Sequence, residues 1–169
     1  MPDANSTDAL IARLDRWLQT HRPEYYASLQ PGATDADLDV FEARYELVLP
    51  AAFRALYRWR DGQRGSKSLV DNRMFMSLRR IASTRDMLDP MIGYDFEAGW
   101  WRTSWVPFLD NGGGDYLCID LEAEDGGMPG QIFPFWHDDG DFRDPTHPSF
   151  EAWLHDLVTS MEDGTYTQV

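Results

Sequence analysis

The segment Ser104–Trp136 constrains the fold most, because short apolar runs alternate in it with turns rich in glycine and acidic residues. The run Trp105–Leu109 stops at a turn over residues 110–115, whose residue types tolerate conformations that others avoid. Residues 116–121 then carry β-prone side chains, and after a second polar turn residues 131–136 form a further apolar run. The pattern predicts a β-meander, and it contains no catalytic set.

Helices are expected on both sides of this meander. A first helix begins at a cap formed by Ser6 or Thr7, because apolar residues recur behind it at helical spacing. Thr34 and Pro50 have the positions of residues that start a second and a third helix. Ser149 caps a closing helix with one apolar stripe. Three helices are therefore predicted before the sheet and one after it.

The segments between these elements have weaker patterns. Pro23–Gly32 is expected to be a connection, and Asp61-Gly62 is expected to stop the third helix. Ser68–Leu78 alternates in part like a strand, and Arg80–Leu88 predicts a short helix. An aromatic cluster follows, which we expect to complete the core, with a groove wall as the alternative. Its members are Tyr94, Phe96, Trp100 and Trp101.

Length and composition predict one folded domain over residues 1–169. No apolar stretch approaches the ~20 residues that span a bilayer. The first residues also lack the basic start and apolar centre of a signal peptide. We therefore expect a cytoplasmic protein. The single cysteine, Cys118, lies in an apolar run and is expected to be a buried thiol.

The net charge of −14 is unevenly distributed. Residues 103–169 hold 14 acidic side chains and one basic side chain, Arg143, whereas residues 1–70 hold 10 acidic and 9 basic ones. Such a surface repels nucleic acid and anionic membranes, and it accelerates encounter with a basic protein. We expect a protein partner, no nucleic acid and no membrane, although acidity can also serve solubility alone.

Several motifs contain residue types that are found in catalytic or metal sites. Gly112–Asp115 lacks the Lys-Ser/Thr of a phosphate loop and precedes a strand, so it predicts a turn. His137–His147 contains metal-ligand residue types, but no register has the glycine and glutamate spacing of an EF-hand. No nucleophile elbow occurs, and acidic pairs on solvated turns seldom catalyse reactions. We expect no enzyme, cofactor or metal, and keep a hydrolase near His137 and His147 as a weaker alternative.

The order of several short motifs resembles the SUKH superfamily, and its Smi/Knr-type branch in particular. The motifs are W-V-P-F at 105–108, Gly114-Asp115 before L-C-I-D at 117–120, G-Q-I-F at 130–133 and S-F-E-A-W-L at 149–154. Upstream, the resemblance continues in P-G-A-T at 31–34, L-P at 49–50 and L-Y at 56–57 ahead of D-G at 61–62. It covers about residues 8–160, which it implies are the core of a single SUKH-like domain. The resemblance implies an immunity protein that neutralises a toxin, as in bacteria, or a cell-wall regulator, as in fungi. It implies no enzymatic activity.

Together these observations predict an α+β domain, in which N-terminal helices and a C-terminal helix pack against a mainly antiparallel β-sheet. The expected function is immunity by binding a cognate, basic toxin domain that acts as a nuclease or modifies nucleobases. The alternative is a non-enzymatic regulatory scaffold. Acidic turns with two aromatic anchors are expected to ring one face of the sheet and bind this partner. The candidate partner-binding residues are Asp110, Asn111, Asp115, Glu122, Glu124, Asp125, Trp136, Asp138, Asp139, Asp141 and Phe142.

Overall fold

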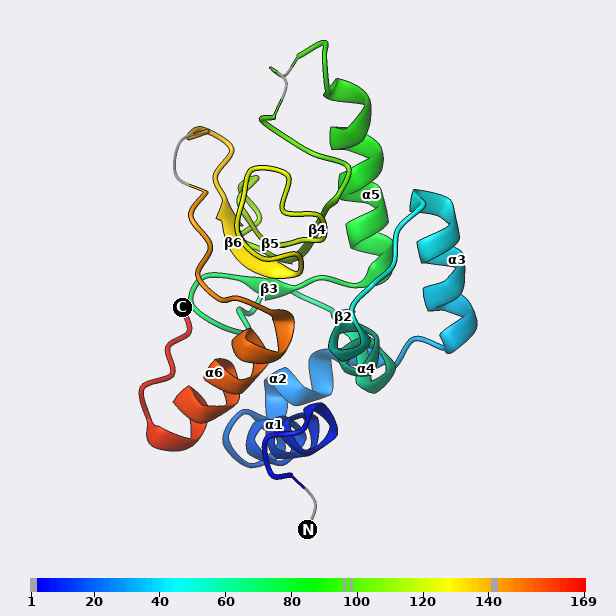
Figure 1. Cartoon of the computed structure of the whole chain (residues 1–169). Coiled ribbons are helices and arrows are strands. Elements are labelled where there is room, and N and C mark those ends of the chain that lie inside the picture. The colour runs from blue at the N-terminus through cyan, green and yellow to red at the C-terminus, as the bar shows by residue number, and fades with distance from the viewer. Residues whose placement is uncertain (1–2, 96, 98, 141–142) are drawn as a thin grey trace.

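A computed structural model describes residues 3–95, 97, 99–140 and 143–169 (Figure 1). It confirms the α+β class, with helices around a four-stranded sheet and a smaller two-stranded one. In chain order the elements are α1 (Thr7–His21), α2 (Pro23–Ser28), β1 (Leu29–Pro31), α3 (Asp35–Tyr45), α4 (Ala51–Trp59), β2 (Arg60–Gln63), β3 (Met74–Phe75), α5 (Leu78–Leu88), the 3-10 helix η1 (Asp89–Met91), β4 (Trp105–Asp110), β5 (Tyr116–Asp120), β6 (Gln131–Phe135) and α6 (Phe150–Asp163).

The predicted helix caps are present. The Ser6 hydroxyl accepts a hydrogen bond from a main-chain N–H of α1, and Ser149 does the same for α6. Thr34 and Asp37 form a reciprocal capping box at the start of α3. Gly164 ends α6 with φ +82°, a left-handed conformation that glycine adopts without strain. The helix boundaries therefore follow from local chemistry.

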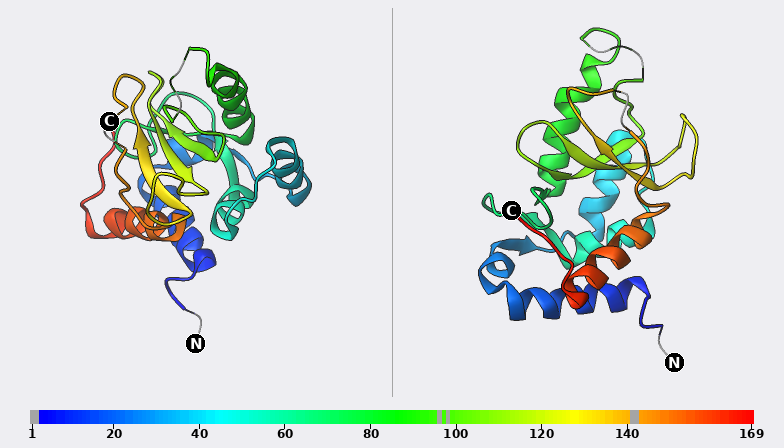
Figure 2. Two further views of the ribbon diagram at one scale, coloured as in Figure 1. Left: turned by 45° about the horizontal axis from the view of Figure 1, so that its top comes forward. Right: turned by 90° about the vertical axis from the view of Figure 1, so that its left-hand side faces the viewer.

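The main sheet is the predicted meander, with strand order β3-β4-β5-β6 and antiparallel pairing throughout. Every residue of β4 and β5 is buried, so both faces of the sheet are covered. On one face Phe108 packs its ring 5.2 Å from that of Phe150 in α6. Helix α5 contacts β4, and Arg85 Nη1 donates to the Trp105 carbonyl at 3.0 Å. Helices α1 and α6 lie side by side (Figure 2).

The N-terminal half differs from the prediction in its short elements. Pro23–Gly32 was expected to be a connection, but it contains α2 and β1. The third helix was expected to stop at Asp61-Gly62, but it ends at Trp59 and β2 begins at the next residue. β2 pairs with β1. At Gly62, φ is +69° and a Cβ atom would lie 2.3 Å from the Ser77 nitrogen, so only glycine fits there. Elements this short depend on tertiary contacts and leave no periodic signal.

Two further expectations are corrected in the middle of the chain. Within Ser68–Leu78, which was expected to alternate as a strand, the strand β3 covers only Met74–Phe75. Ser77 in the same stretch is the N-cap of α5. The aromatic cluster is split: Trp101 is buried, whereas the Tyr94 side chain is 90% exposed. Phe96 lies outside the described residues. Within the described ranges, no helix has the length and apolar character needed to cross a bilayer.

Candidate functional site

The first acidic turn is built into the fold. Asp110 is 1% exposed, and its Oδ2 accepts a hydrogen bond from Arg80 Nε at 2.6 Å. Its Oδ1 accepts from the Gly112 main-chain nitrogen at 2.9 Å. A carboxylate buried under an arginine has no accessible oxygen for a partner. Asp110 therefore stabilises the β4–β5 turn, and sequence reasoning missed this because Arg80 lies thirty positions upstream.

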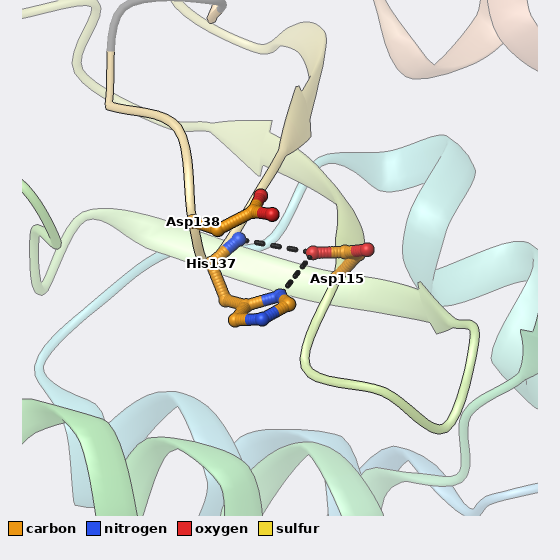
Figure 3. A group of neighbouring side chains, drawn as sticks. All are labelled: Asp115, His137 and Asp138. Atoms are coloured by element: carbon orange, nitrogen blue, oxygen red, sulfur yellow. Dashed lines mark hydrogen bonds and ion pairs between the residues drawn. The ribbon is translucent and has the colours of Figure 1, made fainter.

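Asp115 and His137 form a clip between the β4–β5 turn and the end of β6 (Figure 3). Asp115 Oδ1 accepts from the His137 main-chain nitrogen at 2.9 Å and lies 2.8 Å from the ring Nδ1. Its Oδ2 accepts from Asn111 at 2.9 Å. Burial opposes ionisation of Asp115, but these hydrogen bonds outweigh it and lower its pKa. The hydrogen bond that the His137 ring makes to Asp115 raises the pKa of His137.

The residues of the clip include a possible set of metal ligands at this end of the sheet. Donor atoms of Asp115, His137 and Asp138 lie within 4.8 Å of one another. However, both Asp115 oxygens already accept hydrogen bonds, and the raised pKa of His137 favours a protonated ring, which cannot be a ligand. The donor set fits an ion pair better than a metal.

The region around His147 was the other candidate for chemistry. His147 Nδ1 lies 2.9 Å from the Thr146 hydroxyl, and Nε2 lies 3.0 Å from an Asp156 oxygen. The main-chain nitrogen of Thr146 donates to the Ile132 carbonyl in β6, and the Ile132 nitrogen donates to the His147 carbonyl. These contacts tie the chain ahead of α6 to β6 and to the helix itself. The thiol of Cys118 is fully buried, and burial raises its pKa, so it is a poor nucleophile.

The second acidic turn lies at the opposite end of the meander. Arg102 binds both Asp125 oxygens, at 3.0 and 2.7 Å, and one Glu124 oxygen at 2.6 Å. Glu122, in the same turn, is exposed. Strand β5 separates this turn from Asp115, and a rise of ~3.4 Å per residue gives a separation on the order of 15 Å. The acidic turns thus form two groups at opposite ends of the sheet and do not make one ring.

The remaining predicted residues lie after β6. Trp136 is partly buried, and the Arg73 guanidinium lies 5.3 Å from its ring centre. Asp138 is exposed, and Asp139 is partly buried. Asp141 and Phe142 lie outside the described residues. Of the two predicted aromatic anchors, Trp136 therefore offers only part of its ring to a partner.

A pocket of about 550 Å³ opens between the β5–β6 turn and the chain after β6. Its walls combine aromatic rings with charged groups. They include Trp100, Trp105, Phe133, Asp125, Arg143 and Asp144. The Arg143 guanidinium lies 4.3 Å from the centre of the Phe135 ring, and burial lowers its pKa. Sequence reasoning missed this pocket, although the isolation of Arg143 in an acidic half was a usable signal.

The fold and these sites define the class of the protein: an α+β domain that offers a polar pocket and exposed carboxylates. Residues 32–156 match the model of the SMI1/KNR4 family (SUKH-1), so the chain belongs to this family and the resemblance is confirmed. The family is generally non-enzymatic, and its domain suggests protein–protein interaction.

Two curated relatives extend this comparison. The chain is 23% identical over 200 aligned positions to a glucan synthesis regulatory protein of Neurospora crassa, covering 89% of this chain and 37% of that protein. It is 44% identical over 50 residues to F-box protein SKIP16 of Arabidopsis thaliana, covering 30% of this chain and 12% of that protein. The chain thus spans well under half the length of either relative.

Proposed function

We propose that this chain is an immunity protein that acts in the cytoplasm by binding a basic toxin domain. The excess of carboxylates in residues 103–169 carries the proposal, because 14 acidic side chains face one basic one there. Membership of the SMI1/KNR4 family supports a binding role. A nuclease or nucleobase-modifying toxin has a positive cleft for phosphates, and carboxylates complement such a cleft. Neutralisation by occupancy requires no catalysis.

The accessible carboxylates divide the proposed contact surface into two parts. Glu122, Glu124 and Asp125 occupy the turn after β5, and Asp138 with Asp139 follow β6, beside the partly buried Trp136. Arg102 neutralises part of the first group, whereas Asp138 is exposed. We therefore assign Asp138 a larger role in attracting the toxin than Glu124 and Asp125, which Arg102 binds.

The primary test is co-expression with candidate basic toxin domains, beginning with any that is encoded beside this gene. Growth rescue together with a complex that survives purification is the expected result. Unrelieved toxicity and no complex, from a folded sample, would reject pairing with that toxin. The charge argument is tested separately by Asp138→Asn with Asp139→Asn, which should slow association at low salt. Asp3→Asn with Asp8→Asn changes the net charge equally at the N-terminus and should have a smaller effect.

The regulatory scaffold is the second candidate. The observation that favours it is the alignment of 89% of this chain with the Neurospora crassa glucan synthesis regulatory protein. A scaffold should retain several proteins of its own cell in an affinity pull-down without any toxin. An immunity protein should instead retain one toxin domain tightly, and this comparison separates the two functions.

A further inference from the structure

Two residues that line the pocket carry buried N–H groups with no acceptor among the described residues. Within the described ranges, Nη1 and Nη2 of Arg143 and Nε1 of Trp105 have no hydrogen-bond partner. Each of these atoms has less than 1 Å² of solvent-accessible surface. Trp105 itself is 2% exposed and lines the pocket, as Arg143 does. Buried donors in folded proteins almost always have partners, because an unpaired donor costs free energy. These donors would gain from an acceptor that a ligand brings.

The position of Arg143 shows how an acceptor can reach them. Its guanidinium lies 4.3 Å from the Phe135 ring centre, 5.4 Å from that of Trp105 and 5.5 Å from that of Trp100. Among the described residues, the side chain of Arg143 donates one hydrogen bond, from Nε to the Gly140 carbonyl at 3.2 Å. A change of side-chain rotamer, which is common on binding, would turn Nη1 and Nη2 toward the pocket.

The surrounding charges select the kind of acceptor. Asp120, Asp125, Asp144 and Glu97 line the pocket, and Arg102 is engaged by acidic neighbours. A carboxylate on the ligand would meet these like charges, whereas a neutral carbonyl would not. A cation beside that carbonyl would be attracted by Asp144, which is exposed, and by the aromatic walls. A polypeptide with basic side chains supplies both groups.

We infer that this pocket binds a basic segment of a partner polypeptide, with a main-chain carbonyl on Trp105 and Arg143 and a lysine or arginine side chain at Asp144. The inference rests on the proposed function insofar as the toxin supplies that segment. It deepens that function by adding a docking point for main chain to the charge attraction described above. The carbonyl fixes the register of the segment, and the basic side chain gives selectivity.

The test is an NMR titration of the whole chain with capped tripeptides, one with a central arginine and one with a central glutamate. The indole groups of Trp59 and Trp101 donate to Asp15 and Asp89 and serve as bonded references. We expect the Trp105 indole proton, assigned with Trp105→Phe, to resonate upfield of these references. It should move downfield with the arginine peptide, as a new hydrogen bond forms.

Charge variants complete the experiment. Asp144→Asn should weaken binding of the arginine peptide by ~2- to 5-fold, the usual effect of an exposed ion pair. Asp8→Asn, an equal change of charge on α1, should leave it unaltered. A Trp105 resonance that stays in place with about 10 mM arginine peptide would overturn the inference. A larger shift with the glutamate peptide would overturn it as well.

These outcomes are distinct from those for the proposed function. If the peptides fail while the toxin domain co-purifies, the pocket inference falls and the immunity function stands. If the arginine peptide binds while the toxin does not, the pocket stands and pairing with that toxin is rejected.

Discussion

Replacing Arg85 tests how the pocket wall is held in place. Arg85 is 1% exposed in α5, and Nη1 donates to the Trp105 carbonyl at 3.0 Å. Nη2 donates to the Thr103 carbonyl at 2.6 Å and to Asp89 at 3.2 Å. One guanidinium thus joins α5 to the start of β4 and to η1. Arg85→Met keeps a long, unbranched side chain and removes all three hydrogen bonds.

The expected loss follows from what the substitution leaves behind. The carbonyls of Thr103 and Trp105 lose a donor, and Asp89 loses its cation while keeping the hydrogen bond from Trp101 at 2.8 Å. Removing one partner of a buried ion pair costs ~3 to 5 kcal/mol. For a chain of this length, that corresponds to a fall in melting temperature of ~6 to 20 °C. The loss is large compared with the net stability of a typical domain.

Urea unfolding followed by circular dichroism and tryptophan fluorescence measures this change. Arg79→Met is the matched control, because Arg79 is an exposed arginine of the same helix. Its effect should stay within ~0.5 kcal/mol. A free energy of unfolding for Arg85→Met within ~1 kcal/mol of the control, at an unchanged denaturant slope, would refute this account of Arg85.

Three further predictions concern the clip, a turn and the thiol. Because the pKa of His137 is raised, the ion pair stabilises the fold fully below about pH 6.5, and this stabilisation is lost as the pH rises further. Because the pKa of Asp115 is lowered, the stabilisation is also lost when the pH falls below about 3.9. The stability difference between wild type and His137→Gln should therefore peak at about pH 5 and shrink by about pH 8; a difference independent of pH contradicts the ion pair. Gly62→Ala should lower the melting temperature more than Gly65→Ala, since φ is positive at both and only Gly62 lacks room for a Cβ. Cys118 should react with a thiol reagent only after unfolding, and fast labelling of the native protein would show that it is accessible.

The sequence predicted elements whose signals are local or periodic. The caps at Ser6, Thr34 and Ser149 and the meander between residues 105 and 135 are as expected, because glycine turns and hydroxyl caps act through near neighbours. The strands β1 and β2 were missed because they are short and pair across the chain.

The candidate site was less predictable than the fold. Residue types identified which side chains are acidic, but their accessibility depends on distant partners. Arg80 covers Asp110, and Arg102 engages Glu124 and Asp125. The pocket joins residues from separate segments, and Trp105 was expected only as a strand residue. Burial of a donor without an acceptor has no counterpart in a single sequence.

The chain after β6 is fastened to the sheet at two points, by the Asp115–His137 clip and by the bonds of His147 to Ile132 and Asp156. Ile132 belongs to the hydrophobic core, but the side chains of Asp115, His137, His147 and Asp156 do not. Exposed positions between them, such as Asp138 and Asp144, can therefore change with little loss of folding stability. Substitutions at Asp138 and Asp144 would therefore change the charge that this segment offers to a partner protein while the core stays the same.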